Sequence, residues 1–370
     1  MLPFITLYLT SRGYSVPQAG LGLAGYGLGA IGAQAVGGLL ADRIGRRNTI
    51  VLSMLGGATL TLSLVWVEGL WPIVLVVLLL GFFGELYRPA SSALVADLVA
   101  PEARVAAFSV YRMMINIGFA CGLALGGILA GESYHLLFIG DAVTSTLFAL
   151  IAITALPHGT RTTKREERER DRTSAGRSIL ADKGFLLVMG AVFATAAIYM
   201  QNATTFALHV TDLGYSTRVY GFLLAMNGVL VVLFELPISS WTQHRHRTHM
   251  IALGAVLVGL GFAELAFIKA VPGLLLMVVI WTAGEIIESP ATSAFVADRA
   301  PAHARGRYQG ALGMMYASAA VVGPLVGTWI YHFSPTALWI GCGVAGFGSA
   351  ALALAAGRQP VPTVVGDQLT

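Results

Sequence analysis

Eight ionisable side chains lie inside long apolar stretches of this sequence, where a charge is costly and is usually kept for function. They are Glu85, Arg88, Arg112, Asp141, Glu235, Glu264, Glu285 and Glu288. Glu285 and Glu288 are three residues apart, which places both carboxyl groups on one face of a helix. Two like charges on one buried face favour a protonated acid, so we expect this pair to carry a transferable proton.

Glu85 and Arg88 repeat this spacing, with a base in place of the second acid. A carboxylate beside an arginine tends to stay ionised, so Glu85 ranks behind Glu285 and Glu288 as a proton carrier. The alternative for Glu85 is a structural ion pair with Arg88 or Arg112. We expect no proton-carrying role for the other three acids.

The composition places these charges in a lipid bilayer. Hydrophobic residues make up 56% of the 370 residues, charged residues only 11%, and the mean hydropathy is +0.74. A spanning helix needs about 20 mostly apolar residues. Eleven such stretches are Ala19–Ala41, Thr49–Val67, Trp71–Val95, Val105–Ala130, Tyr134–Leu156, Phe185–Val210, Val219–Trp241, Met250–Ile268, Gly273–Val296, Tyr308–Tyr331 and Thr336–Ala356. The opening MLPFITLYLT is about half a span, and we expect it to be the outer half of a further helix whose beginning is missing.

Lysines and arginines divide unevenly between the two sides of the membrane that these spans define. Eighteen fall on one side, and only Arg12, Arg218 and Lys269 fall on the other. Positively charged loops stay on the cytoplasmic side, so we expect both chain termini there. The net charge of +4 then follows from topology, and no nucleic-acid partner is expected.

The spans fall into two blocks that are copies of each other. Glu85 and Pro89 recur as Glu285 and Pro290, at offsets of 200 and 201 residues, and the surrounding residues agree in the same way. Such an internal repeat is typical of secondary transporters, whose two halves rock around a central site.

A polar segment separates the two blocks. It is dense in both signs of charge and nearly free of apolar residues, which is typical of a flexible linker. We therefore expect a six-helix half with a truncated first helix at 1–156, a cytoplasmic linker at 157–184, a second six-helix half at 185–357 and a cytoplasmic tail at 358–370.

The loop GGLLADRIGRRNTI, residues 37–50, carries a cluster of charge between two predicted spans. It resembles the G-x-L-A-D-R-x-G-R-R loop between helices 2 and 3 of the major facilitator superfamily, through Gly38, Leu40, Ala41, Asp42, Arg43, Gly45, Arg46 and Arg47. The glycines of the fifth helix are similar to a pattern of drug antiporters in that family, although Leu123 stands at the proline position. They are Gly118, Gly122, Gly126 and Gly127. Arg112 and Asn116 resemble an Arg-x-x-x-Asn-x-Gly pattern of bacterial drug exporters.

This resemblance implies an all-α membrane protein with the twelve-helix fold of two six-helix bundles, here with its first helix incomplete. It also implies drug:proton antiport across a bacterial cytoplasmic membrane. In that fold, helices 1, 4, 7 and 10 line a central cavity, which favours the acids of helices 4 and 10 as functional groups.

We expect the loop at 38–47 to act as a conformational latch. Its glycines would let the chain turn tightly and the two helices approach. Asp42 is expected to lie against the N-terminal end of helix 11, near Gly306. Three arginines are expected to pair with Asp97 at the end of helix 4: Arg43, Arg46 and Arg47. The alternative is that these arginines only follow the positive-inside rule.

Candidate substrate contacts on helices 4, 7, 8 and 10 are aromatic, amide and methionine side chains. They are Phe83, Tyr87, Tyr199, Gln201, Asn202, Met226, Asn227 and Trp281. Apolar walls with few polar groups suit lipophilic or amphipathic ligands. Ordinary helix packing is the alternative for many of them.

Together these features predict a proton-coupled secondary transporter that exports drug-like or amphipathic small molecules by alternating access. The alternatives are proton-coupled uptake of a metabolite or peptide, and a non-transporting receptor or assembly partner. The sequence has no G-x-x-x-x-G-K-[ST] loop for ATP, and we expect no enzyme activity. Cys121 and Cys342 have no patterned partners, so no metal or cofactor is expected. The expected partners are a small-molecule substrate, protons and the lipid bilayer, with the protein a monomer.

Overall fold

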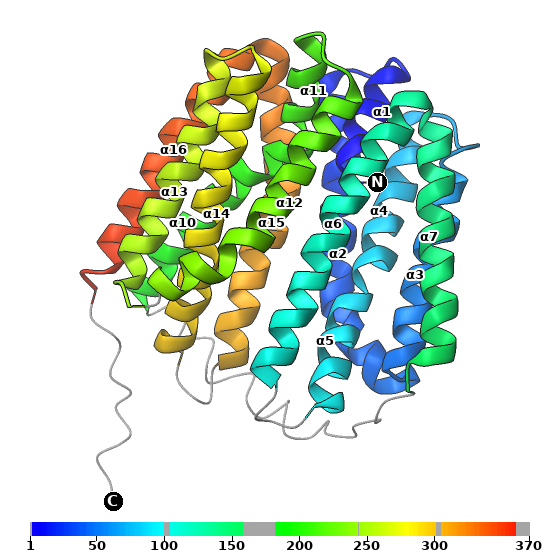
Figure 1. Ribbon diagram of the computed structural model, residues 1–370, viewed down its shortest axis with the longest axis horizontal. Helices are drawn as coiled ribbons and strands as arrows, with labels where there is room; N and C mark the ends of the chain where they lie inside the picture. The colour runs from blue at the N-terminus through cyan, green and yellow to red at the C-terminus, as the bar shows by residue number, and fades with distance from the viewer. Residues whose placement is uncertain (1, 100–103, 158–181, 243, 301–304, 360–370) are drawn as a thin grey trace, which may run out of the picture. The chain divides into compact units, whose positions relative to one another are not determined.

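The computed structural model describes residues 2–99, 104–157, 182–242, 244–300 and 305–359, and these form helices with short connections (Figure 1). The helices are η1 Leu2–Phe4, α1 Ile5–Ser11, α2 Val16–Ile44, α3 Arg46–Ser63, α4 Leu70–Glu85, α5 Tyr87–Leu98, α6 Arg104–Glu132, α7 Tyr134–Ala155, α10 Lys183–Tyr199, η3 Met200–Ala203, α11 Thr205–Asp212, α12 Thr217–Thr242, α13 Arg247–Ala263, η4 Glu264–Ala266, α14 Val271–Arg299, α15 Arg305–Phe333 and α16 Pro335–Ala356. No strand occurs in these residues, which agrees with the predicted all-α class.

Within the described part of the chain, nine helical segments are long and apolar enough to cross a membrane. The protein is therefore a multi-pass membrane protein. Two further predicted spans coincide with α2 and α3, which are helical but are not among the nine. α3 has 18 residues and begins with Arg46 and Arg47, so its sequence is less apolar than those of the nine.

The ends of α2 follow local sequence rules. Ser15 and Gln18 form a capping box, in which Ser15 Oγ accepts from the Gln18 amide and Gln18 Oε1 accepts from the Ser15 amide at 2.8 Å. Gly45 ends the helix with φ of 92°, a conformation that favours glycine. α3 begins at the next residue, so a single glycine makes the turn between the two helices.

One predicted span, Trp71–Val95, is in fact divided into α4 and α5, which are separated by Leu86. The Ser53 side chain of α3 occupies the interruption: its hydroxyl donates to the Phe83 carbonyl and accepts from the Tyr87 amide at 3.2 Å. These two backbone groups are four residues apart and would otherwise bond to each other. A buried hydroxyl therefore replaces one helical hydrogen bond.

A second predicted span, Phe185–Val210, is divided into α10, η3 and α11. Thr204, between η3 and α11, has φ of −122° and ψ of −91°, which is not helical. The periodicity of apolar residues could not reveal either interruption, because both are stabilised by polar groups from other helices.

The described chain packs into two compact units, and each combines separate stretches of sequence. The first unit consists of Met1–Thr163, Met200–Val232 and Ala320–Pro335. The second consists of Lys164–Tyr199, Leu233–Ala319 and Thr336–Thr370. α12 and α15 each contribute to both units. The division into two six-helix halves at 157–184 remains a prediction.

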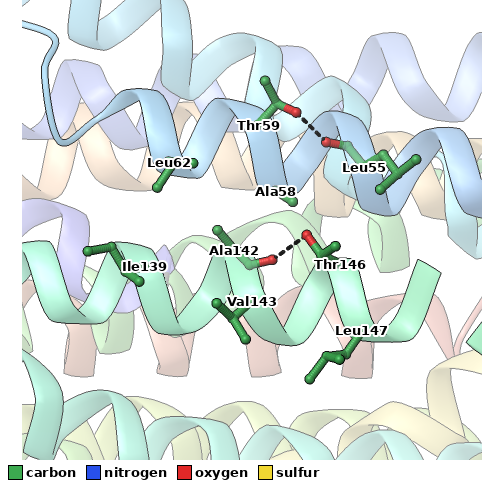
Figure 2. A pocket seen from close by; sticks show the side chains of 9 residues that line it. All are labelled: Leu55, Ala58, Thr59, Leu62, Ile139, Ala142, Val143, Thr146 and Leu147. Atoms are coloured by element: carbon green, nitrogen blue, oxygen red, sulfur yellow. Dashed lines mark hydrogen bonds between the residues drawn. The ribbon is translucent and has the colours of Figure 1, made fainter. Parts of the chain in front are cut away.

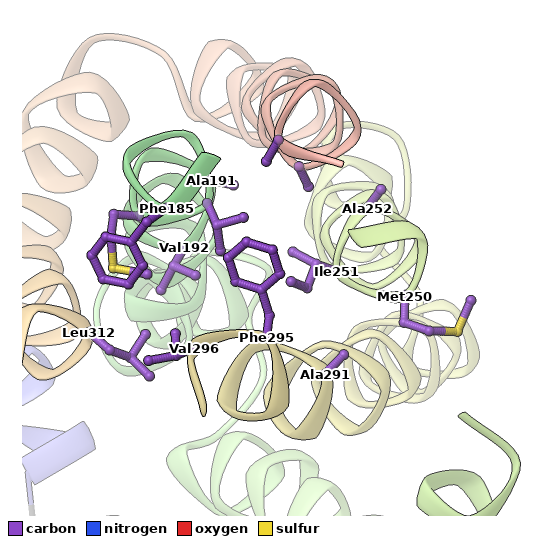
Figure 3. Close-up of a cluster of buried hydrophobic side chains, with 14 of the residues drawn as sticks. Phe185, Ala191, Val192, Met250, Ile251, Ala252, Ala291, Phe295, Val296 and Leu312 are labelled. Carbon is purple, nitrogen blue, oxygen red and sulfur yellow. The ribbon is translucent and has the colours of Figure 1, made fainter. Parts of the chain in front are cut away.

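An apolar core fills the second unit between α10, α13, α14 and α15 (Figure 3). It contains buried side chains from three of these helices: Phe185 and Val192 of α10, Ile251 of α13, and Phe295 and Val296 of α14. Figure 3 shows Phe295 lying between Val192 and Ile251. This packing holds α14, the helix that carries Glu285 and Glu288, against α10 and α13.

Candidate functional site

The two acids of α14 have different surroundings within the second unit. Glu285 is partly exposed, and its Oε1 accepts a hydrogen bond from the Tyr199 hydroxyl of α10 at 3.3 Å. Glu288, one turn further along α14, is only 8% exposed. The predicted pair thus consists of one accessible carboxyl group and one buried carboxyl group.

Tyr199 belongs to an aromatic layer. Its ring stacks on that of Trp281, with centroids 5.4 Å apart and planes at 17°. Phe262 of α13 contacts the Trp281 ring edge-on at 5.0 Å and lies 6.3 Å from Trp339. Trp281 is only 1% exposed and therefore lies behind Tyr199, so its predicted contact with substrate would require this layer to open.

A hydroxyl group lies beside Glu288. It belongs to Thr195 of α10, and it lies 2.8 Å from the hydroxyl of Ser349 in α16. Thr195 and Ser349 are 5% and 1% exposed, so the polar cluster is closed on this side. The sequence pattern did not reveal Thr195, although it lies one turn before Tyr199.

α13 comes very close to α14 at this level. A Cβ atom on Gly254 would lie 2.6 Å from the Cβ of Glu288 and 2.7 Å from the Gly284 carbonyl oxygen. Any larger residue would displace backbone or the stem of Glu288. Glycine at this position therefore keeps Glu288 in its buried place.

The corresponding acid of the first unit has a base beside it. Glu85 forms an ion pair with Arg88, and its Oε1 accepts a hydrogen bond from the Tyr26 hydroxyl at 2.9 Å. The Arg88 side chain is 51% exposed and its guanidinium lies 5.8 Å from the Tyr87 ring centre. The ion pair predicted as the alternative for Glu85 is thus present with Arg88, whereas the Arg112 side chain lies outside the described residues.

The other six predicted substrate contacts are all in the first unit, and two of them are buried. Gln201 is 4% exposed, donates to the Gly323 carbonyl at 3.0 Å and accepts from the Thr205 hydroxyl at 2.9 Å. It fixes η3 to α15. Asn227 of α12 is also 4% exposed. Four are partly exposed, a position compatible with substrate contact: Phe83, Tyr87, Asn202 and Met226. Asn116 of α6 is partly exposed as well.

The loop between α2 and α3 is linked to its neighbours through backbone carbonyls. Arg46 is 8% exposed and donates to the Ala93 carbonyl of α5 at 2.9 Å, and Arg47 donates to the Ile153 carbonyl of α7 at 3.3 Å. Arg43 is exposed. The side chains of Asp42 and Asp97 lie outside the described residues, so their predicted pairings stay predictions.

Gly38 does not serve the close helix approach that we expected of it. A Cβ atom there would meet nothing within 4 Å. Its neighbour Gly37 is the one at a contact, because a Cβ atom there would lie 2.7 Å from Pro89. The sequence of the loop could not distinguish these two adjacent glycines, because only the packing of α5 against α2 decides which one is crowded.

A buried ion pair that the sequence analysis missed closes one end of the second unit. Arg299 Nε, at the end of α14, lies 2.7 and 2.8 Å from the two carboxyl oxygens of Asp182. The side chains are 6% and 0% exposed. Asp182 also accepts from the Phe185 amide at 2.9 Å and thereby caps α10. Aspartate three residues before a helical amide is an N-cap signal that could have revealed it.

An apolar groove of about 400 Å³ lies between α3 and α7 in the first unit (Figure 2). Leu55, Ala58 and Leu62 face Ile139 and Val143 across it. Its two threonine hydroxyls donate to carbonyls of their own helices, so the walls offer no free polar group. It has none of the features of a polar binding site.

Contacts within the first unit join the beginning of the chain to its middle. The Tyr220 hydroxyl of α12 donates to the Asn202 carbonyl at 2.8 Å and lies 3.3 Å from the Pro3 carbonyl. Gly127 of α6 meets Gly221 of α12, where an added Cβ atom would lie 2.9 Å from the Gly221 Cα. The first unit therefore packs α1 and α6 firmly against η3 and α12.

None of the described residues form a group of three or more histidine, cysteine or acidic side chains that could hold a metal ion. α14 offers two carboxyl groups: Glu285, which accepts a hydrogen bond from a tyrosine, and Glu288, which is buried beside Thr195. Such groups can bind a cation or hold a proton.

Comparison with known proteins agrees with this architecture. The sequence model described as the Major Facilitator Superfamily matches residues 1–324 and 203–368. The chain is 26% identical to the uncharacterized MFS-type transporter YqjV of Bacillus subtilis (strain 168) over 336 residues, which are 89% of this chain and 80% of that protein. It is 25% identical to the multidrug resistance protein MdtH of Salmonella paratyphi C (strain RKS4594) over 355 residues, 94% of this chain and 87% of that one.

Solved structures share the fold at lower sequence identity. The nucleoside transporter NupG superposes with a TM-score of 0.81 at 16% identity, over 96% of this chain and 94% of that one. A peptide transporter crystallised with sulfate gives 0.79 at 17% identity, over 95% and 89% of the two chains. The family match, the repeat and the membrane helices agree: the chain belongs to the Major Facilitator Superfamily.

Proposed function

We propose that this protein is a proton-coupled secondary transporter that exports drug-like or amphipathic small molecules by alternating access. The observation that carries the proposal is the acid pair of α14, in which Glu288 is 8% exposed in a membrane-spanning helix. A carboxyl group in such a place is costly unless it is protonated or has a function. A proton that binds and leaves during the cycle would supply the energy for transport.

The direction of transport rests on similarity. MdtH, 25% identical over 94% of this chain, is named a multidrug resistance protein, which favours export. The partly exposed ring of Tyr199, which stacks on the buried Trp281, suits amphipathic molecules. The lysine and arginine distribution supports both termini in the cytoplasm. Similarity to transporters of Bacillus subtilis and Salmonella favours the bacterial cytoplasmic membrane, and we propose that the protein acts there as a monomer.

We also propose that the α2–α3 loop acts as the conformational latch. The donations from Arg46 to Ala93 and from Arg47 to Ile153 support this role, because they tie the turn at Gly45 to α5 and α7. Contacts of this kind are each worth about 1 kcal/mol, enough to bias two states that differ by a few kcal/mol.

The function is tested by transport in proteoliposomes with an imposed pH gradient, screened over a panel of amphipathic molecules. We expect accumulation that requires the gradient and is lost when a protonophore collapses it. Glu288→Gln should abolish gradient-driven accumulation while sparing exchange of labelled for unlabelled substrate. Undiminished accumulation without the gradient would contradict proton coupling. Movement of substrate in the same direction as protons would show that the protein is an uptake transporter and not an exporter.

A further inference from the structure

A basic surface lies in the second unit, where α12 ends and α13 begins. The connecting stretch WTQHRHRTH, residues 241–249, contains two arginines, three histidines and no acid. Four of these basic side chains are exposed: His244, Arg245, His246 and His249. The lysine and arginine distribution predicts that this end of the helices faces the cytoplasm. A dense group of basic side chains therefore lies directly outside a membrane-spanning helix.

Trp241 fixes the level of this surface in the bilayer. It is the penultimate residue of α12, a helix long and apolar enough to span the membrane, and it is 50% exposed. Tryptophans at the ends of spanning helices lie at the level of the lipid headgroups. The Arg245 guanidinium lies 5.2 Å from the centre of the Trp241 ring. This contact holds the arginine at the same level, where the phosphate groups of the lipids are.

The end of α16 brings a further arginine to this surface. A Cβ atom on Gly357 would lie only 2.6 Å from the Thr248 hydroxyl oxygen, so the chain after α16 runs beside the first turn of α13. Arg358, the next residue, is exposed. Residues about 110 positions apart in the sequence thus contribute to one surface.

Two arginines of this surface have no acidic partner. Within the described part of the chain, Arg245 and Arg358 form no ion pair. Arg247 differs, because its Nε lies 3.4 Å from Asp298 Oδ2 of α14. In the first unit, Arg46 at the start of α3 is 8% exposed and donates to a backbone carbonyl. The charge of Arg245 and Arg358 is therefore left for a partner outside the chain.

The histidines make the charge of this surface depend on pH. The His246 and His249 rings meet edge-on with their centres 5.0 Å apart, and His246 Nδ1 lies 3.2 Å from the Thr248 hydroxyl oxygen. The described charged groups on the helices around them are Glu235 of α12, Asp182 and Lys183 at the start of α10, Asp298 and Arg299 of α14, and Arg358 after α16. An imidazole gains a positive charge in mildly acidic solution, whereas arginines and ordinary carboxylates keep their charge between about pH 6 and 8. Mild acid therefore adds positive charge to this surface through its histidines.

We propose that this surface, formed by Trp241, the basic residues of 244–249 and Arg358, binds the headgroup of an anionic phospholipid such as phosphatidylglycerol. The phosphodiester of this lipid carries a negative charge, and its oxygens accept hydrogen bonds from arginine and protonated histidine. Each basic residue close to an anionic membrane surface strengthens the attraction about fivefold. The position of Trp241 at headgroup level favours a lipid over a soluble anion. Occupation of the site does not depend on the transport function proposed above.

The test is native mass spectrometry of the purified full-length protein in detergent, titrated with dioleoyl phosphatidylglycerol and, in parallel, with dioleoyl phosphatidylcholine. We expect phosphatidylglycerol to bind at least about fivefold more tightly, since only this lipid carries a net negative charge. Arg245→Gln and Arg358→Gln should each weaken its binding about fivefold, because each removes one positive charge. Lowering the pH from about 8 to about 6 should strengthen binding about threefold or more, and the double variant His244→Gln, His249→Gln should remove most of this increase.

Arg12→Gln is the matched control. Arg12 is also exposed and its guanidinium lies 5.9 Å from the centre of the Tyr8 ring, but it falls on the predicted outer side. Circular dichroism and monodispersity in detergent establish that each variant is folded. Equal binding of the two lipids would overturn the proposal, as would equal losses in Arg245→Gln and Arg12→Gln. Displacement of phosphatidylglycerol by inorganic phosphate or by RNA at the same concentration would also overturn it, because a lipid site must prefer the lipid.

Discussion

α14 and the α4–α5 pair come from one repeated stretch, GELYRPA in the first half and GEIIESPA in the second, yet only α14 is continuous. The neighbouring helix makes the difference. In the first unit, the Ser53 hydroxyl of α3 bonds to the Phe83 carbonyl and the Tyr87 amide, and so replaces the helical hydrogen bond between them. In the second unit, Gly254 of α13 presents no side chain and lies directly against α14.

The same two segments also differ in charge. Glu85 is paired with Arg88 and Tyr26, whereas Glu285 is followed at the same spacing by a second acid, Glu288. A repeated backbone has therefore acquired an ion pair in one half and an acid pair in the other. The comparison teaches that repeat symmetry predicts the position of a functional residue but not its protonation chemistry, which depends on its neighbours.

The largest effect is expected at the anchored end of α14. Arg299→Met should lower the free energy of unfolding by about 3–5 kcal/mol, because it leaves the fully buried carboxylate of Asp182 without its ion-pair partner. Unfolding in mixed micelles of detergent and sodium dodecyl sulfate measures the change. Arg358→Met, at an exposed arginine, is the control, and the double variant with Asp182→Asn should recover part of the loss. A loss no greater than that of Arg358→Met would show that α14 is not held at this end.

The close approach of α13 to α14 comes next. Gly254→Val should destabilise the protein by about 1–3 kcal/mol, because its Cβ would collide with the backbone at Gly284 and the stem of Glu288. Gly57→Ala in α3 is the matched control, since a Cβ there would meet nothing within 4 Å and alanine favours a helix. Equal unfolding free energies for the two variants would contradict the view that Gly254 is crowded by α14 whereas Gly57 has open space.

The hydroxyl at the interruption of α4 and α5 should have a smaller effect. Ser53→Ala is expected to cost about 1–2 kcal/mol, because the Phe83 carbonyl and the Tyr87 amide lose a buried partner. Hydrogen exchange at the Tyr87 amide would report the change. Ser63→Ala removes a hydroxyl that bonds only to Leu60 of its own helix and serves as control. Slower exchange in Ser53→Ala would mean that the helix closes to become continuous like α14.

The ion pair of the first half should contribute least. Arg88→Gln is expected to change the free energy of unfolding by less than about 1 kcal/mol, since the arginine side chain is 51% exposed and Glu85 keeps its hydrogen bond from Tyr26. The same unfolding assay measures it beside Arg299→Met. A loss as large as that of Arg299→Met would refute the distinction between an exposed ion pair and a buried one.

Much of this architecture could be predicted from the sequence. The apolar stretches located most spanning helices to within a few residues, because the bilayer imposes a similar length and composition on every span. They did not reveal the divisions within Trp71–Val95 and Phe185–Val210. The glycine turn at Gly45 and the three-residue spacing of Glu285 and Glu288 followed in the same way, since both depend on residues close together in the chain.

The tertiary structure alone decided which of these groups are accessible and which are paired. The interruption at Ser53, the burial of Glu288 beside Thr195, and the bond between Asp182 and Arg299 join residues from 30 to more than 100 positions apart. Within a membrane, neighbouring helices must satisfy polar groups that water cannot reach. The partner of each buried charge is therefore set by helix packing, which the periodicity of a single helix does not encode.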